Sequence, residues 1–249
     1  QALGRLYLAA FDGRTVGEPR LLTRATDEFE HFPSWSRDGK QVAYVAWNDR
    51  RLASVRVVAA GGGESRTVTS EPGHYLDPVF SPDGGTIVYV RTGGGYLTSP
   101  LWGQEQGVYA VAAGRPGDKA RTSPRRIATR GESPHFGAAG DRVFLVTRDG
   151  GKDSDGVSLV SVPLAGATPG EGERTHYTSD WATEMRVSPD GGRIAFVERH
   201  RVWTAPFVDA GKPVAVAPNG TNLPITKLGA AAGAYLHWAG DGRSLRWSL

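Results

Sequence analysis

The chain has 249 residues, of which 39% are hydrophobic, and it carries 29 Lys and Arg against 26 Asp and Glu. The formal charge of +3 is too small to predict a nucleic-acid-binding surface, and the lack of cysteine excludes disulfides and thiolate metal sites. No apolar run approaches the roughly 20 residues that span a bilayer. With 34 glycines and 16 prolines, turns are frequent and long helices are not expected.

In chain order, two short β-rich runs over residues 4–9 and 19–23 come first, and then one phrase recurs five times. Each copy has an aromatic or branched residue, a small residue, a tight turn and a β-rich run. The copies cover residues 33–39, 78–84, 134–140, 185–191 and 236–242, and the residue before the turn glycine recurs at spacings of 45, 56, 51 and 51 residues. Repeats of this length, each too small to bury its own core, are typical of radially repeated folds.

Each complete copy supplies four strands, which we illustrate with the second. Its first strand covers residues 76–81, and residues 82–84 form the turn, because proline presets φ and glycine accepts a positive φ. The second, third and fourth strands are predicted over residues 86–90, 107–111 and 125–129. The pattern predicts an all-β fold of four-stranded antiparallel blades.

Two further details of the repeats are predicted in the same way. The fourth strand of the fourth copy is expected over residues 212–217. The large anchors of the innermost strands are expected to pack in the ring core, and they are Trp35, Phe80, Phe136 and Trp238.

The two ends of the chain predict how the ring is completed. The chain starts with a third and a fourth strand and ends with a first and a second strand, so pairing of the ends would close the ring. We then expect one domain over residues 1–249, with blades over residues 26–70, 71–130, 131–180, 181–220, and 233–249 completed by 1–25. The alternative is a piece of a longer ring whose missing strands lie upstream of Gln1.

The Ser-Pro-Asp-Gly copies at residues 81–84 and 188–191, with the variant at 35–39, resemble the WD40-like (PD40) repeats of TolB-like β-propellers. The resemblance covers nearly the whole chain. The two ends, residues 1–7 at the start and residues 233–238 and 245–249 at the end, also resemble the propeller region of large bacterial metal-dependent amidohydrolases. That resemblance implies a propeller joined to a hydrolase domain in a multidomain bacterial protein, with a periplasmic or secreted location.

The sequence contains no recognisable catalytic motif. The six histidines show neither His-x-His nor His-Glu-x-x-His spacing, and there is no nucleophile elbow, Walker loop or dinucleotide fingerprint. The chain thus departs from the amidohydrolase pattern at its metal ligands. We predict no catalytic residue, no metal site and no cofactor in this segment.

A weaker signal comes from the loops that lead into the innermost strands, which lie around the channel mouth of a propeller. We expect a polar ring there, formed by His31, His74, Asp77, Glu132, His135, Glu184, Arg186 and His237. Such a ring would bind a small anionic or peptide ligand in the channel, or an ion held by Asp77, Glu132 and Glu184. Alternatively, these side chains are hydrogen-bonded between blades or to channel water and bind no ligand.

Two loops on the same face complete the candidates. The loop over residues 92–106 is long and carries Tyr96 and Trp102, which suit a partner contact, or else pack on their own blade. The loop over residues 149–156 has three carboxylates, but it lacks the downstream glutamate of a calcium loop, so an ordinary Asp/Gly hairpin is expected.

These observations favour a non-catalytic binding and scaffolding propeller within a larger amidohydrolase-like protein. Its expected partner is another protein or an adjacent catalytic domain, to which it presents loops or for which it gates substrate. The first alternative is a free-standing TolB-like interaction module of the cell envelope. The second is a hydrolase with a metal at the channel mouth.

Overall fold

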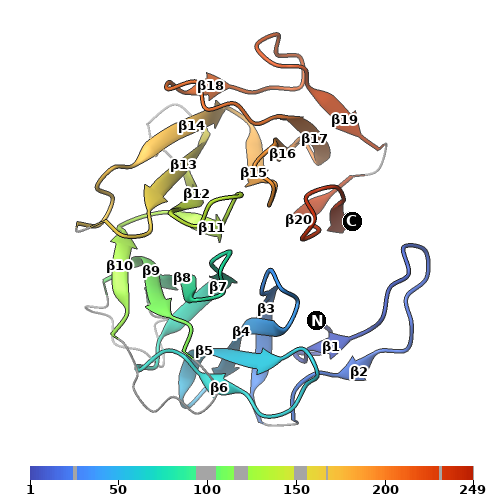
Figure 1. Ribbon diagram of the computed structural model, residues 1–249, viewed down its shortest axis with the longest axis vertical. Helices are drawn as coiled ribbons and strands as arrows, with labels where there is room; N and C mark the ends of the chain where they lie inside the picture. The colour runs from blue at the N-terminus through green and yellow to red at the C-terminus, as the bar shows by residue number, and fades with distance from the viewer. Residues whose placement is uncertain are drawn as a thin grey trace. The chain divides into compact units, whose positions relative to one another are not determined.

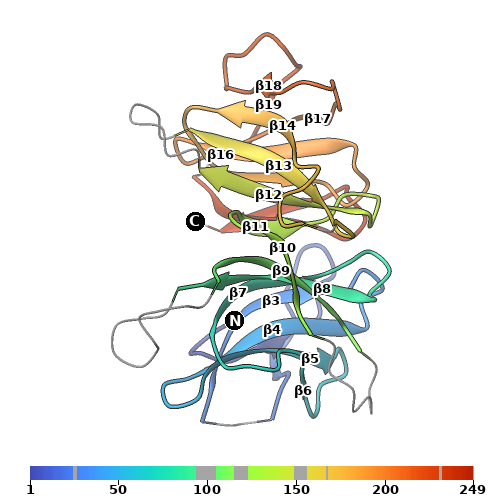
Figure 2. The same ribbon diagram turned by 90° about the vertical axis from the view of Figure 1, so that its left-hand side faces the viewer.

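The computed structural model describes residues 1–24, 27–93, 105–114, 123–148, 156–166, 168–229 and 232–248. These residues form 21 β-strands and no helix, which confirms the all-β class (Figures 1 and 2). Within the described part of the chain, no helix is long and apolar enough to cross a membrane. The chain divides into two compact units, Gln1–Arg126 and Ile127–Leu249, which we describe separately as unit 1 and unit 2.

Unit 1 contains two four-stranded sheets, in each of which neighbouring strands follow one another along the chain (Figure 1, blue to green). The first sheet comprises β3 (Phe29–Trp35), β4 (Gln41–Asn48), β5 (Leu52–Ala59) and β6 (Arg66–Thr67). The second comprises β7 (His74–Phe80), β8 (Thr86–Thr92), β9 (Gly107–Ala112) and β10 (Arg125–Ala128), of which the last two residues are counted with unit 2. At the N-terminus, β1 (Tyr7–Leu8) pairs with β2 (Arg20–Leu21) in a separate two-stranded sheet.

Unit 2 also contains two larger sheets, but in each of them the last strand does not directly follow its neighbour along the chain (Figure 1, green to red). Its first sheet comprises β11 (Glu132–His135), β12 (Arg142–Arg148), β13 (Val157–Pro163), β14 (Arg174–Ser179) and β18 (Val214–Ala215). Its second sheet comprises β15 (Ala182–Val187), β16 (Arg193–Glu198), β17 (Arg201–Pro206) and β19 (Thr226–Leu228). The C-terminal pair is β20 (Ala234–Trp238) with β21 (Leu245–Ser248). Because the two terminal pairs lie in different units, ring closure and a single domain stay predictions.

The predicted fourth strand over residues 212–217 belongs to a different sheet from the one expected. β18 pairs in parallel with β14 of the preceding sheet, and the Val216 N–H donates to the Thr178 carbonyl at 2.8 Å. The apolar Val216 is buried in the same cluster as Tyr177, so this segment covers the open edge of the neighbouring sheet. β19 takes the fourth position beside β17, and this blade therefore extends beyond residue 220.

The repeated turn is held by hydrogen bonds between its own side chains and backbone. Ser36 Oγ donates to Asp38 Oδ1 at 2.7 Å and accepts from the Gln41 N–H at 2.9 Å. Asp38 Oδ1 also accepts from the Lys40 N–H at 3.0 Å. The turn glycine, Gly39, has a φ of 69°, which glycine adopts without steric cost. The same bonds recur in the second and fourth copies, around Ser81 with Asp83 and around Ser188 with Asp190.

Four of the five innermost strands share a bulge with a left-handed residue, which the sequence analysis did not predict. The four residues, Phe32, Asp77, Ser133 and Tyr235, have φ values of 52°, 48°, 54° and 58°. Each lies where the strand register shifts, so the bulge occupies one fixed position in the repeat. In three copies a proline follows, which has no N–H to leave unpaired.

The predicted anchors do not all lie in a core. Phe80 and Phe136 are buried, and Trp238 packs partly buried against a cluster around Leu236. In contrast, 51% of Trp35 is exposed, so the prediction of a core position is wrong for this residue within unit 1. The apolar cores are built mainly from the second and third strands of each sheet.

Candidate functional site

In unit 1, the predicted ring residues lie on the innermost strands of the two sheets. The ring of His31 lies beside Gln1, whose Nε2 is 2.8 Å from Nδ1. The ring of His74 packs against Trp47, with 5.0 Å between the ring centroids. Asp77 is the left-handed residue of its bulge. These contacts are compatible with either alternative stated for the ring.

In unit 2, His135 links two neighbouring innermost strands. Its Nδ1 donates to the Ser133 carbonyl at 2.9 Å, and its Nε2 accepts from the Val187 N–H at 2.9 Å. Burial, and then the charge of Arg186, lower the pKa of His135 to about 3. The imidazole is therefore neutral near pH 7, and both of its nitrogens already have partners.

Glu184 has a similar role one strand further along. Its carboxylate accepts from the Tyr235 N–H at 2.7 Å and from the Leu236 N–H at 2.9 Å. These donors lie at the bulge of β20, where the other bulged copies have proline instead of Leu236. The carboxylate thus pairs backbone groups that the bulge leaves without ladder partners.

The other ring residues of unit 2 are closer to solvent. Glu132 forms an ion pair with Arg148 at 2.8 Å, with both side chains about half exposed. The Arg186 carbonyl accepts from Trp238 Nε1 at 3.2 Å. His237 is exposed, and partial desolvation followed by the charge of Arg186 lowers its pKa. Because solvent reaches this ring, we expect it to keep part of its basicity.

The proposed ion ligands are divided between the units, Asp77 in unit 1 and Glu132 and Glu184 in unit 2. Among the residues that the structure describes, no group of three or more His, Asp or Glu side chains is arranged to hold a metal ion. The ring as a ligand-binding site stays a prediction. Tyr96 and Trp102 lie outside the described residues.

Exposed aromatic side chains near the start of the innermost strands were missed by the sequence analysis. In unit 2, Trp181 is 59% exposed directly before β15, and Tyr235 is 73% exposed at the bulge of β20. In unit 1, Phe32 is 42% exposed at the equivalent bulge position. For Phe32 and Tyr235, but not for Trp181, the available signal was an aromatic residue at a repeat position that is Asp, Ser or Glu in the other copies.

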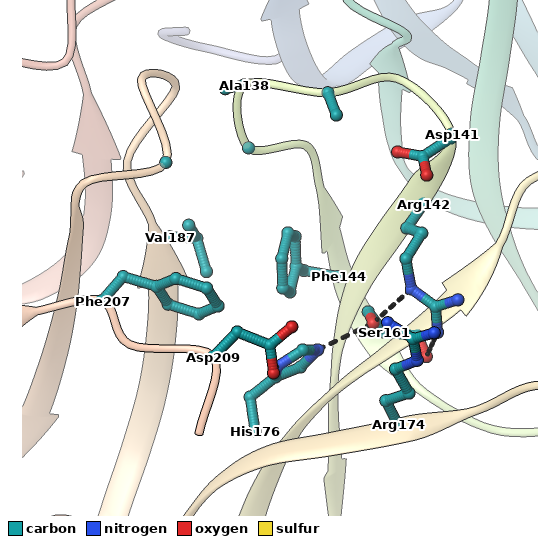
Figure 3. A pocket seen from close by; sticks show the side chains of 13 residues that line it. Ala138, Asp141, Arg142, Phe144, Ser161, Arg174, His176, Val187, Phe207 and Asp209 are labelled. Atoms are coloured by element: carbon teal, nitrogen blue, oxygen red, sulfur yellow. Dashed lines mark hydrogen bonds and ion pairs between the residues drawn. The ribbon is translucent and has the colours of Figure 1, made fainter. Parts of the chain in front are cut away.

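A second feature of unit 2 is a cavity of about 180 Å³ at the opposite end of the sheets, beside the turn that joins β11 to β12 (Figure 3). Its lining includes the turn residues Gly137, Ala138 and Ala139. The remaining lining residues are Asp141, Arg142, Phe144, Ser161, Arg174, His176, Val187, Gly191, Phe207 and Asp209.

Three of these side chains have the order of a catalytic triad but not its accessibility. Ser161 Oγ lies 2.8 Å from His176 Nε2, and His176 Nδ1 lies 3.8 Å from Asp209 Oδ1. Ser161, however, has 0% exposure in the middle of β13, so its oxygen cannot reach a substrate. Burial lowers the pKa of His176, which favours the neutral ring. Its Nε2 then accepts a hydrogen bond from the Ser161 hydroxyl group. This network is therefore a packing element of the cavity wall.

The repeated antiparallel sheets of four or more strands, three of which contain the same side-chain-bonded turn, define the class of β-propellers. No family model matches the chain. Among solved structures, it is similar to TolB from Acinetobacter baumannii, with 16% identity and a TM-score of 0.67 over 97% of this chain and 53% of that one. It is also similar to a putative TolB from Agrobacterium tumefaciens, with 15% identity and a TM-score of 0.65 over 99% and 84% of the two chains. The chain therefore has the TolB-like β-propeller fold.

Two further comparisons concern a hydrolase and a peptidase. A crystal structure of puromycin hydrolase matches with 20% identity and a TM-score of 0.55, over 90% of this chain and 36% of that one. The uncharacterized peptidase YuxL of Bacillus subtilis is 36% identical over 65 residues, which are 26% of this chain and 9% of that protein. The chain thus spans about half of the Acinetobacter TolB and a small part of YuxL.

Proposed function

We propose that this chain is a non-catalytic binding propeller that contacts a protein partner at the end of the sheets where the innermost strands begin. The observation that carries the proposal is the exposure of Trp181 and Tyr235 there. Trp and Tyr supply most of the binding energy at many protein interfaces. Large aromatic side chains at the surface of unit 2 are thus better suited to a partner than to solvent.

The Tyr235 backbone is held in place for such a contact. Its N–H donates to Glu184, and the adjacent Leu236 is fully buried. A contact residue whose backbone is already ordered loses less conformational freedom on binding than one in a mobile segment. The rigid strands of the propeller thus support the proposed contact residue.

We further propose that the partner is an adjacent domain of a larger hydrolase-like protein. The matches to puromycin hydrolase and to YuxL, of which this chain covers only a part, support this proposal. A metal-dependent amidohydrolase as the parent protein is the more specific form suggested by the two ends of the chain. A free-standing interaction module is the alternative, which is supported by the 84% coverage of the Agrobacterium TolB.

The test compares the chain with the double variant Trp181→Ala/Tyr235→Ala. Val208→Ala is the matched control, because Val208 is also exposed but follows β17 at the opposite end of the sheets. Where the coding sequence continues, the adjacent segment is expressed separately, and its binding to the immobilised propeller is measured by surface plasmon resonance. We expect at least tenfold weaker binding by the double variant and unchanged binding by the control. Equal binding by all three proteins would contradict the proposed surface.

The free-standing and catalytic alternatives have their own readouts. Without an adjacent segment, quantitative pull-down from extracts of the source organism with the same three proteins identifies the partner. Metal analysis and a hydrolase screen of the purified chain test the metal-dependent alternative. A stoichiometric metal together with an activity that Glu132→Ala abolishes would overturn the non-catalytic assignment.

A further inference from the structure

The cavity of unit 2 lies where the third repeat departs from the others. Its turn has Gly137 where the first, second and fourth copies have serine, and Ala139 where they have aspartate. On β12, Phe144 lies opposite His135. The position of Phe144 is alanine or valine in the sheets of the first, second and fourth repeats. A Cβ on Gly137 would lie 3.3 Å from Phe144 Cε2, so the glycine makes room for the phenylalanine. The open turn and the aromatic wall are therefore one coordinated change.

A second departure concerns arginines at one repeat position of the fourth strands. Arg20 donates to the Ala60 and Gly61 carbonyls at 3.1 and 3.2 Å. Arg66 donates to the Ala113 carbonyl and, at 3.0 Å, to Gln41 Oε1. In these two sheets the guanidinium group is thus occupied by carbonyl acceptors.

In the sheet of the third repeat, which is the first sheet of unit 2, the same position is Arg174. It lies opposite Ser161 as Arg66 lies opposite Val57. Here the position of Gln41 is taken by Arg142, a donor in place of an acceptor. Within the described ranges, the side chain of Arg174 forms no hydrogen bond or ion pair. Figure 3 shows the guanidinium groups of Arg142 and Arg174 on the same side of the cavity. Two positive charges therefore share a place that has one charge and an acceptor in the first sheet.

Arg142 is fixed in position by hydrogen bonds that bring no negative charge to its guanidinium group. Its Nε donates to Ser161 Oγ at 2.8 Å, and one terminal nitrogen donates to the Ser161 and Gly172 carbonyls at 2.8 and 2.7 Å. All of these acceptors are uncharged. Burial, and then the charge of Arg174, lower the pKa of Arg142, as expected for like charges placed together. An anion between the two guanidinium groups would relieve this repulsion.

The rest of the cavity selects among anions. Asp141 and Asp209 are exposed at its rim, and they balance the two arginines in formal charge, which favours a monoanion over a phosphate dianion. Phe144 and Phe207 form an edge-to-face pair 5.6 Å apart, and the ring of His176 lies 5.3 and 5.5 Å from them. An apolar cavity of about 150 Å³ is large enough for benzene. The present volume therefore suits a single ring beside the arginines.

We propose that this cavity binds a small carboxylate with a flat apolar body, with the carboxylate on Arg174 and Arg142 and the ring against Phe144 and Phe207. The site lies at the opposite end of the sheets from Trp181 and Tyr235 and does not depend on the proposed protein partner.

Isothermal titration calorimetry with benzoate and with inorganic phosphate tests the proposal on the whole chain. We expect saturable binding of one benzoate, and at least tenfold weaker binding by Arg174→Gln, which removes one of the two charges. We expect the same loss in Arg142→Gln, because this variant would place a glutamine beside Arg174 as Gln41 lies beside Arg66. The matched control is Arg66→Gln, which removes the equivalent arginine of unit 1 and should leave benzoate binding unchanged. Melting temperatures measured without ligand identify a variant that fails to fold. If Arg142→Gln unfolds, Arg174→Gln still tests the proposal, because the Arg174 side chain has no described partner to lose.

Three results would overturn the proposal. They are no saturable benzoate binding to the unaltered chain, equal binding to Arg174→Gln, and tighter binding of phosphate than of benzoate. Benzyl alcohol, which has the ring without the charge, should bind at least tenfold more weakly than benzoate, and equal binding would show that the arginines are not the anchor.

Discussion

His135 and Glu184 are polar side chains of the innermost strands that bond to backbone groups of the next strand, about 50 residues along the chain. Ser34 does the same in unit 1, where its hydroxyl donates to the Pro78 carbonyl. Each of these bonds pairs a backbone group that no ladder partner reaches. Such residues are expected to contribute to stability even though the sequence alone suggests a ligand site.

The neutral His135 should make stability depend on pH. Its pKa falls from the ordinary value of 6.5 to about 3 on folding, so between these values the unfolded chain binds the extra proton. Stability should therefore fall as the pH drops below 6.5, by about 2 kcal/mol between pH 7 and pH 5 from this residue alone. Urea denaturation across this range measures the effect.

The matched variants are His135→Gln, whose amide oxygen can still accept from Val187, and His200→Gln at an exposed histidine. The pH dependence should become shallower in the first and stay unchanged in the second. An unaltered pH dependence in His135→Gln would mean that this ring is not held neutral by the fold.

Loss of the Glu184 carboxylate should destabilise the C-terminal strand pair. Glu184→Ala leaves two backbone donors of the β20 bulge without partners, and we expect a loss of about 1–3 kcal/mol in the free energy of unfolding. Glu132→Ala is the control, because its exposed ion pair with Arg148 should contribute less than about 1 kcal/mol. Equal losses in the two variants, measured by urea denaturation, would refute the assigned role of Glu184.

At the scale of elements, the turn copies form a natural comparison within one chain. Asp83 accepts from Ser81 Oγ and from the Gly85 N–H, whereas Asp241 accepts from the Arg243 N–H in a turn that has Ala239 instead of serine. Asp83→Ala should therefore cost about 1–2 kcal/mol of unfolding free energy, and Asp241→Ala should cost less. Chemical denaturation of both variants measures the difference. A larger loss in Asp241→Ala would show that the serine does not strengthen the turn.

At the scale of the whole molecule, the repeat register predicts how the two terminal strand pairs would meet. Leu8 lies opposite Arg20 as Val57 lies opposite Arg66, and Arg246 lies opposite His237 as Ala43 lies opposite Ser34. Because Ala43 and Val57 are partners in the first sheet, closure would place Leu8 opposite Arg246.

The chain has no cysteine, so an engineered pair gives an unambiguous test of closure. In the double variant Leu8→Cys/Arg246→Cys, we expect an intramolecular disulfide under mild oxidation, because opposed residues of paired strands lie within its reach. Non-reducing electrophoresis and peptide mapping detect it, with Leu8→Cys/Arg201→Cys as the control for random collisions. Disulfides between chains only would favour pairing of the ends between molecules.

The turns and the strands were predictable because their causes are local. The Ser36 and Asp38 bonds lie within six residues, and the β-branched second strands indicate burial on both faces. The position of residues 212–217 was not predictable, because the sequence does not show which sheet edge this short segment pairs with. It pairs with β14, and β19 pairs with β17 instead. The exposure of Trp35 was missed because a repeat pattern assigns equal surroundings to every copy.

The sequence by itself determined the all-β class, the repeat and its turn chemistry, because each depends on residues that are close along the chain. Only the tertiary structure decided what the polar residues of the innermost strands contact, because His135 meets Val187 and Glu184 meets Leu236 about 50 residues away. It also decided that the irregular third repeat encloses a cavity with two arginines on one side. That result depends on side chains from β12, β13 and β14 together with the segment after β17, whose proximity no local pattern indicates.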